Sequence, residues 1–174
     1  MIYKREHINP GTDSEQWYIS SRAAEAYPFA SVLFKEGGYC ILDKDFWIER
    51  PKAKGYSTMI ISLSGQGKFI QEDGTEFLIG EGEAFISSPE SQGHREETAG
   101  DRSWEHIWLT FYRSSSILPS EDFDWKIMQV PEPSLCRELM MNIIREDIST
   151  TEESRLAIEL SERLLLLSIR RMLQ

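Results

Sequence analysis

The chain has few of the residues that build metal centres or disulfide frameworks. Its 174 residues include two cysteines and three histidines, namely Cys40, Cys136, His7, His94 and His106. The cysteines are far apart, and no two histidines lie within four residues of each other, so metal-ligand spacing is missing. We therefore expect no bound metal, no cofactor and reduced cysteines in a cytoplasmic protein, with a disulfide between the two cysteines as the alternative.

Long hydrophobic runs and an excess of positive charge are missing too. The longest aliphatic run, residues 164–167, is far too short to cross a membrane, and the N-terminal residues lack an apolar secretion segment. There are 19 Lys and Arg residues against 29 Asp and Glu residues, which gives a net charge of −10. Because phosphate-rich surfaces repel acidic chains, we expect no direct contact with DNA or an anionic membrane.

Glycine-rich turns divide the middle of the chain into short apolar stretches. Between residues 32 and 112 a turn signal recurs about every ten residues, which is typical of a β-sandwich or β-barrel. Asp73-Gly74 predicts a hairpin between residues 68–71 and 76–79. With 40% hydrophobic residues, the chain can bury the core of one domain.

The most informative segment is residues 104–112, in which apolar and polar residues alternate. Ile107, Leu109 and Phe111 share one face, which is typical of a core. The other face combines aromatic rings with hydrogen-bonding groups, from Trp104, His106, Trp108, Thr110 and Tyr112. Such a face suits the wall of a pocket for a small polar ligand. An aromatic-rich core with a satisfied histidine is the alternative.

Two helices are predicted after the β-rich region. The first covers roughly residues 135–147, where apolar residues recur at helical spacing. The second starts near Thr151 and runs to the end of the chain. Ser149-x-x-Glu152 and Thr150-x-x-Glu153 both fit a capping box at its start.

The last helix has more apolar surface than one partner can cover. One stripe consists of Ala157, Leu160, Leu164, Leu165 and Ser168. A second stripe consists of Leu156, Glu159, Arg163, Leu166 and Arg170. We expect the second stripe to form a homodimer interface, with cross-chain ion pairs of Glu159 and Arg163. A well-buried core helix and a contact with a neighbouring domain are the alternatives.

Arg50 is the residue most suited to ligand binding outside residues 104–112. It follows a strand-like aromatic segment at residues 46–48 and precedes Pro51. At the mouth of a barrel, its guanidinium would donate several hydrogen bonds to hydroxyl groups or a carboxylate of a ligand. A surface arginine paired with Glu49 or another acid is the alternative.

The sequence carries no recognisable catalytic motif. No serine lies in a nucleophile-elbow pattern, and Gly65-x-Gly67 lacks the lysine of a phosphate-binding loop. The adjacent acids Glu96 and Glu97 are typical of solvated loop charges. Residues 51–55, where small β-barrel metalloenzymes often carry a histidine pair, contain Lys52 and Lys54 and no histidine. We therefore expect no catalytic residues and no enzyme activity.

Several short motifs occur in the order and spacing of the N-terminal half of AraC-type transcriptional regulators. They lie at residues 47–51, 54–56, 64–67, 76–77, 82–83, 89, 94, 104–108 and 111, and near the end at 156–160 and 164–166. A single piece such as Gly65-x-Gly67 is unspecific, whereas the ordered set is specific. Over about residues 30–174, the chain therefore resembles this family.

The resemblance implies a mainly β fold with C-terminal α-helices. A cupin-like β-barrel (a double-stranded β-helix or jelly roll) would be followed by two helices that form a dimerisation element. Residues 1–130 would supply an N-terminal arm and the effector-binding barrel, and residues 131–174 the dimerisation segment. The family binds a small effector, often a sugar, and contacts DNA through a separate half with two helix-turn-helix units. That half is absent from this chain, so DNA is expected as a partner only through it.

The resemblance also implies a set of ligand-binding residues. Pocket residues of the arabinose-responsive member match Arg50, His106 and Trp108. Arg50 would donate to sugar oxygens, His106 would hydrogen-bond a hydroxyl group, and Trp108 would stack on the C–H face of the sugar. Glu96 stands where that member has a tyrosine, which argues against arabinose itself. Trp104 shares the face of the strand that carries His106 and completes the set.

Two other functions stay open. A small stand-alone cupin enzyme acting on a sugar or related metabolite would need a histidine-rich metal site, which the sequence lacks. A pure dimerisation module with a vestigial pocket would form a dimer and bind no ligand. Our prediction is a ligand-sensing and dimerisation domain that binds a polar effector without chemistry.

Overall fold

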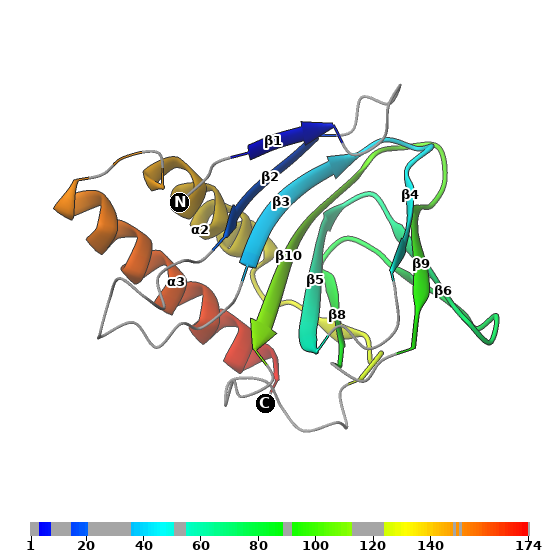
Figure 1. The fold of residues 1–174 in the computed structure, drawn as a ribbon. Coiled ribbons are helices and arrows are strands. Elements are labelled where there is room, and N and C mark those ends of the chain that lie inside the picture. Colours follow the sequence, from blue (N-terminus) through cyan, green and yellow to red (C-terminus); the bar gives the residue numbers. More distant parts are fainter. Residues whose placement is uncertain are drawn as a thin grey trace.

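The computed structural model contains two antiparallel β-sheets and two long helices (Figure 1). It describes residues 4–7, 15–20, 36–50, 55–88, 92–112, 124–147, 149 and 151–173, and for residues 4–7, 15–20, 36 and 112 the backbone only. The strands are β1 (Lys4–His7), β2 (Glu15–Ser20), β3 (Glu36–Leu42), β4 (Trp47–Arg50), β5 (Tyr56–Ser64), β6 (Gly67–Gln71), β7 (Glu76–Ile79), β8 (Glu83–Ser87), β9 (His94–Thr98), β10 (Trp104–Tyr112) and β11 (Met128–Gln129). The helices are α2 (Pro133–Glu146) and α3 (Glu152–Met172).

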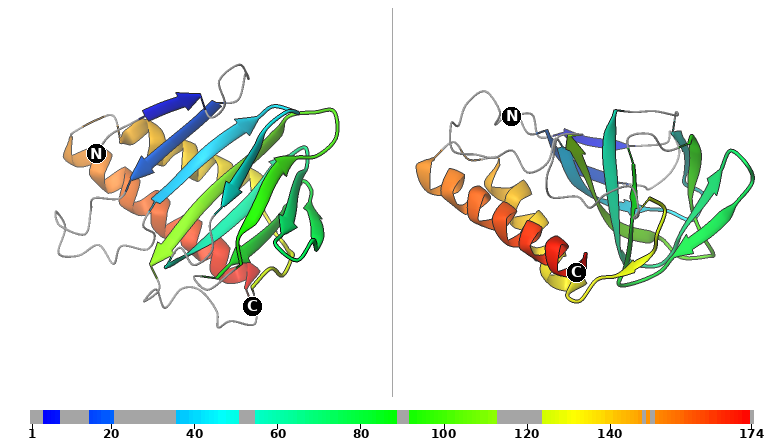
Figure 2. Two further views of the ribbon diagram at one scale, coloured as in Figure 1. Left: turned by 45° about the vertical axis from the view of Figure 1, so that its right-hand side comes forward. Right: turned by 90° about the horizontal axis from the view of Figure 1, so that it is seen from below.

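The two sheets and the helices form layers. The larger sheet has the strand order β1-β2-β3-β10-β5-β8-β11, and the smaller has the order β4-β9-β6-β7. Helices α2 and α3 cover one face of the larger sheet, and the smaller sheet lies on its other side (Figures 1 and 2). The predicted mainly β fold with two C-terminal helices is confirmed.

Strand β10 lies between the two cores of the protein, as its alternation predicts. Ile107, Leu109 and Phe111 are fully buried in the core that the sheet shares with α2 and α3. Trp104 belongs to the second core, which lies inside the barrel between the sheets. Successive residues of one strand therefore face the helices and the barrel interior in turn.

Trp104 is fully buried in the barrel interior. Its side chain is 0% exposed, and its Nε1 donates to the hydroxyl of Ser62 at 3.1 Å. A side chain at Gly67 would overlap the indole, so glycine is needed there for the ring to approach the backbone of β6. The Phe69 ring meets the indole edge to face, with centroids 5.7 Å apart.

The predicted hairpin is confirmed by β6 and β7. The two strands pair antiparallel, and the turn between them contains Asp73 and Gly74. The Asp73 carboxylate accepts a hydrogen bond from the backbone N–H of Thr75 at 2.8 Å. Gly74 has φ of 83°, a left-handed conformation that favours glycine.

Both helices lie where the sequence predicts them, but the cap of α3 differs. The N-cap is not Ser149, and the second predicted box begins at Thr150, which lies outside the described residues. Instead Thr151 is the N-cap, and its side chain accepts a hydrogen bond from the backbone N–H of Ser154 at 3.2 Å. Three consecutive hydroxyl residues precede the helix, and local pattern does not distinguish which of them begins it.

The expected dimer residue Leu166 faces the protein's own core. It is 4% exposed and lies with Leu165 and Ile169 in the core that the two helices share with the larger sheet, so the prediction that Leu166 lies in the dimer interface is wrong. Four leucines of α3 are exposed instead, namely Leu156, Leu160, Leu164 and Leu167. A run of four leucines spans a whole helical turn, and only packing decides which members face inward.

None of the described helices is both long enough and apolar enough to span a membrane.

Candidate ligand-binding site

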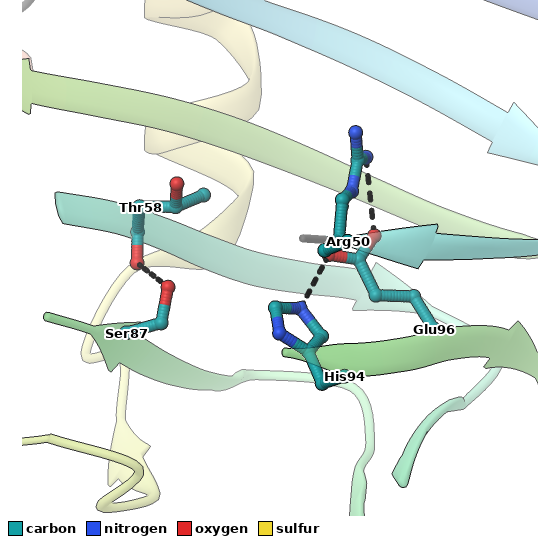
Figure 3. Close-up of polar contacts among 5 residues, drawn as sticks. All are labelled: Arg50, Thr58, Ser87, His94 and Glu96. Atoms are coloured by element: carbon teal, nitrogen blue, oxygen red, sulfur yellow. Dashed lines mark hydrogen bonds and ion pairs between the residues drawn. The ribbon is translucent and has the colours of Figure 1, made fainter. Parts of the chain in front are cut away.

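Strands β4 and β9 bring together an arginine and a glutamate inside the barrel. Their antiparallel register places Arg50 opposite His94, two residues from Glu96. The Arg50 guanidinium binds the Glu96 carboxylate with two contacts, Nε to Oε1 at 3.1 Å and Nη2 to Oε2 at 3.2 Å (Figure 3). Glu96 is 4% exposed, so the expectation of a solvated loop charge is wrong for this residue. The paired fork fixes both side chains.

His94 is a third member of this cluster, and its role was not expected. Because His94 and Glu96 are two residues apart on β9, both point into the barrel. The His94 Nε2 lies 2.9 Å from Glu96 Oε1 (Figure 3). The spacing of the two residues was the available signal, but it required β9 to be recognised as a strand.

The electrostatics of the pair favour two opposite charges. Burial by itself would raise the pKa of Glu96, but the Arg50 charge and the contact with His94 outweigh it and hold this pKa well below its usual range. Glu96 in turn raises the pKa of Arg50, against the opposing effect of burial. The carboxylate is therefore ionised at neutral pH, and the two charges cancel.

His106 enters the same interior from the opposite sheet. Its ring stacks on Trp104 with centroids 4.1 Å apart. Burial lowers the pKa of His106 to about 3, with an opposing effect from Glu96 and a further lowering by Arg50. The imidazole is therefore neutral at physiological pH and offers one acceptor nitrogen.

Trp108 and Cys40, on the neighbouring strands β10 and β3, are in contact in the barrel interior. Trp108 is half-buried, packs on the interior core and hydrogen-bonds the Cys40 thiol. Burial raises the pKa of this thiol far above its usual value, so Cys40 is protonated and unreactive. Cys136 lies in the other core, on the helix side of the sheet, and both cysteines are free. The alternative of a disulfide is therefore excluded.

Several buried polar atoms in this interior have no partner in the described part of the chain. They are Nδ1 of His94, Nδ1 of His106 and Oγ1 of Thr98. Buried polar atoms normally have a hydrogen-bond partner, which a ligand or water atom would have to supply here. The larger sheet contributes Thr58 and Ser87 to the region shown in Figure 3, where the Ser87 hydroxyl donates to the Thr58 carbonyl at 3.5 Å.

The structure brings the five expected ligand-binding residues into one interior region. Arg50 and Glu96 are in direct contact, and both act on the ionisation of His106. Trp104 stacks with the His106 ring, and its indole N–H already donates to Ser62. Trp108 hydrogen-bonds the Cys40 thiol. The charges of Arg50 and Glu96 also affect the pKa of this thiol, so Cys40 lies near both Trp108 and the ion pair.

Trp125 completes the aromatic lining, and the sequence contained no signal for it. Its ring meets the His94 ring edge to face at 4.8 Å and stacks with Phe85 at 5.4 Å. Trp125 has φ of 60° and lies outside the regular strands, so neither alternation nor spacing predicts that it faces inward.

The donor set of the cluster is poor in metal ligands. Across the described ranges, no group of three or more His, Cys, Asp or Glu side chains is placed to hold a metal ion. The Glu96 carboxylate, which would otherwise be available as a metal ligand, is paired with Arg50. The arrangement is suited to hydrogen bonding and stacking with an organic molecule.

Solved structures with a similar fold include AerE from Microcystis aeruginosa, with 14% identity and a TM-score of 0.53 over 74% of this chain and 52% of AerE. A predicted oxalate decarboxylase from Thermotoga maritima has 16% identity and a TM-score of 0.49 over 63% of this chain and 91% of the other. The Cupin_2 domain of an XRE family transcriptional regulator from Enterobacter cloacae has 14% identity and a TM-score of 0.43, covering 56% and 96%. No family model matches the chain, and no curated protein matches it. At these identities the likeness concerns the fold alone.

Proposed function

We propose that this chain is the effector-binding and dimerisation part of an AraC-type transcriptional regulator. Its barrel binds a small polar effector, a sugar or a sugar-like molecule, without chemistry. The observation that carries this proposal is the ion pair of half-buried Arg50 with buried Glu96, which lies with a neutral His106 in an interior lined by aromatic rings. The mainly β fold with two C-terminal helices and the resemblance of the ordered motifs to that family support the proposal.

Each side chain of the cluster has a distinct part in binding. Arg50 donates hydrogen bonds to ligand oxygens, since its side chain is 40% exposed and keeps N–H groups beyond those bound to Glu96. Neutral His106 accepts a hydrogen bond from a ligand hydroxyl group. Trp108 offers the face of its ring to an apolar C–H surface.

The ionisation states of the cluster favour binding over catalysis. At neutral pH Cys40 is held as the thiol, which is not the nucleophilic form. His106, with a pKa of about 3, is far from the range in which a general acid or base works best at neutral pH. Both groups are therefore suited to recognition.

The strand β10 provides a physical route from the ligand to the helices. Trp108 faces the barrel interior, and the next residue, Leu109, is fully buried in the core beneath α2. A ligand that shifts this strand changes the packing under the helices. Regulation further requires that the ligand binds two states of the protein with different affinity.

The exposed leucines of α3 are suited to a second copy of the chain. Leu156, Leu160, Leu164 and Leu167 are all about half exposed and follow a four-four-three spacing along one face. In an antiparallel pair centred on this face, Leu160 lies opposite Leu164 of the partner subunit. The acidic start of α3 then meets the basic end of the partner's α3, which makes the charges complementary.

Ligand binding is tested by thermal unfolding with a panel of neutral pentoses and hexoses, followed by calorimetric titration of any sugar that raises the melting temperature. Arg50→Lys, which cannot form the fork, and Trp108→Leu should each weaken binding at least tenfold. Trp47→Leu is the matched control, because Trp47 is 48% exposed on β4 and its ring contacts Arg95. A sugar whose affinity is unchanged in Arg50→Lys and Trp108→Leu would place the ligand elsewhere. A dimer that binds no sugar would favour the pure dimerisation module.

A further inference from the structure

Both carboxylate oxygens of Glu96 already have partners within the protein. Its Oε1 contacts Arg50 Nε and His94 Nε2, and its Oε2 accepts from Arg50 Nη2. The carboxylate is 5% exposed, whereas the Arg50 side chain above it is 40% exposed. A ligand entering this region therefore meets the arginine before the glutamate.

Arg50 keeps part of its hydrogen-bonding capacity. A guanidinium carries five N–H donors, of which two bind Glu96. The other three have no partner among the described residues. The fork with Glu96 fixes the guanidinium plane, so the remaining donors are held in place before a ligand arrives.

The Arg50–Glu96 pair also determines the net charge of the site that a ligand contacts. The positive charge of Arg50 is compensated by a carboxylate in direct contact, on the buried side. An anionic ligand bound to Arg50 would bring a second negative charge to the same guanidinium, close to Glu96. In an environment of lower dielectric than water, such a like-charge contact is strongly unfavourable.

We propose that Glu96 is the specificity-determining residue of this site, and that it restricts the barrel to uncharged, oxygen-rich ligands by neutralising Arg50 from beneath. Glu96 acts through Arg50 and is a positioning residue. The proposal rests on the proposed function for the existence of a ligand, and it adds the charge class of that ligand. A site that selects by an unfavourable contact discriminates strongly between molecules of similar shape.

Matched ligands and variants separate the role of charge from that of shape. Galactose and galacturonate differ by the replacement of a hydroxymethyl group with a carboxylate, and glucose and glucuronate form a second pair. Glu96→Gln keeps the shape of the side chain and removes its charge. Glu97→Gln makes the same charge change at the next residue, which lies on the other face of β9 and contacts Lys68 and Arg95.

The wild-type protein and Glu97→Gln should be stabilised by neutral sugars and not by the uronates. Glu96→Gln should gain at least tenfold in affinity for the uronates, because Arg50 is no longer compensated. Uronate binding by the wild-type protein, with no gain in Glu96→Gln, would overturn the inference and leave the sensor function standing.

Inorganic sulfate supplies a test that does not depend on the effector. Sulfate should raise the melting temperature of Glu96→Gln more than that of Glu97→Gln, at matched ionic strength set with sodium chloride. The double variant Arg50→Gln/Glu96→Gln, which lacks both charges, should lose this difference. If Glu96→Gln refolds poorly, sulfate should increase its refolding yield selectively. Equal responses of Glu96→Gln and Glu97→Gln would overturn the inference, whereas a failure of all sugars to bind would overturn the proposed function only.

Discussion

Arg137 on helix α2 contacts Glu105 on strand β10, with Nε and Oε1 2.8 Å apart. The same carboxylate accepts hydrogen bonds from the hydroxyl groups of Tyr39 at 2.6 Å and Ser64 at 3.0 Å. Glu105 lies at a register shift of β10, immediately before His106. Glu105 therefore connects helix α2 to strand β10, directly beside His106 of the candidate site.

Glu105→Gln should lower the free energy of unfolding by about 1–2 kcal/mol, because two neighbouring strands and α2 lose a charged acceptor. The contribution of Arg137 is small, since it is half exposed and screened by water. Urea denaturation measures the change. Glu159→Gln is the control: its ion pair with Arg163 lies on the surface of α3, and its loss should change stability by less than about 0.5 kcal/mol. Equal effects of the two substitutions would contradict the bridging role of Glu105.

His106 should make the protein sensitive to mild acid. Its pKa falls from 6.5 to about 3 in the folded protein, so the unfolded chain binds a proton that the folded protein does not. The stability due to this difference is complete above about pH 6.5 and is lost progressively as the pH falls toward 3. Between pH 7 and pH 5, the wild-type protein should lose about 2 kcal/mol more than His106→Gln.

Urea denaturation at pH 7, 6 and 5 measures this difference, and the other titrating groups do not mimic it. Glu96 has a lowered pKa, so its stabilisation persists above its unfolded pKa and is lost only at lower pH. Burial raises the pKa of Glu162 to about 7, so this residue stabilises the folded protein as the pH falls, equally in both variants. Parallel curves for the wild type and His106→Gln would show that His106 is not the cause.

Gly67→Ala should destabilise the barrel by about 1–3 kcal/mol, since the added methyl group overlaps the Trp104 ring. The displaced indole should lose its hydrogen bond to Ser62, and the tryptophan fluorescence spectrum should shift. Gly80→Ala is the matched control, because its new methyl group would meet only the end of the Glu83 side chain, at 3.7 Å. Unchanged stability and fluorescence in Gly67→Ala would contradict this packing.

Helix α3 should mediate dimerisation through its exposed leucines. Light scattering at micromolar concentration should show a dimer for the wild type and a monomer for Leu160→Lys/Leu164→Lys. The monomer should stay folded, because both side chains are about half exposed in the single chain. A wild-type monomer would exclude the interface.

The antiparallel arrangement makes a separate prediction about charge. Glu152→Lys/Glu153→Lys should weaken the dimer, and Arg170→Glu/Arg171→Glu in the same chain should restore it, since each acidic pair would face a basic pair of the partner. Sedimentation equilibrium measures the dissociation constants. A parallel pair would show no restoration, because like ends would then lie together.

Features that depend on local periodicity could be predicted from the sequence alone. The alternation along residues 104–112 placed Ile107, Leu109 and Phe111 on the helix side and Trp104 and His106 inside, as the structure has them. The Asp73-Gly74 turn and the two C-terminal helices could be predicted from the sequence in the same way. Each feature is set by turn chemistry or by a repeat of two or 3.6 residues, which neighbouring residues are sufficient to reveal.

The composition of the candidate site depends on the pairing of strands that are far apart in the chain. Arg50 and Glu96 are 46 residues apart, and only the register of β4 with β9 brings them together, changing Glu96 from an expected surface charge into a buried counter-ion. The same register explains the inward position of His94. Packing in the core shared by the helices and the larger sheet likewise turned Leu166 inward and left Leu160 exposed. These choices depend on which surfaces meet after folding, and the order of residues along one segment does not contain that information.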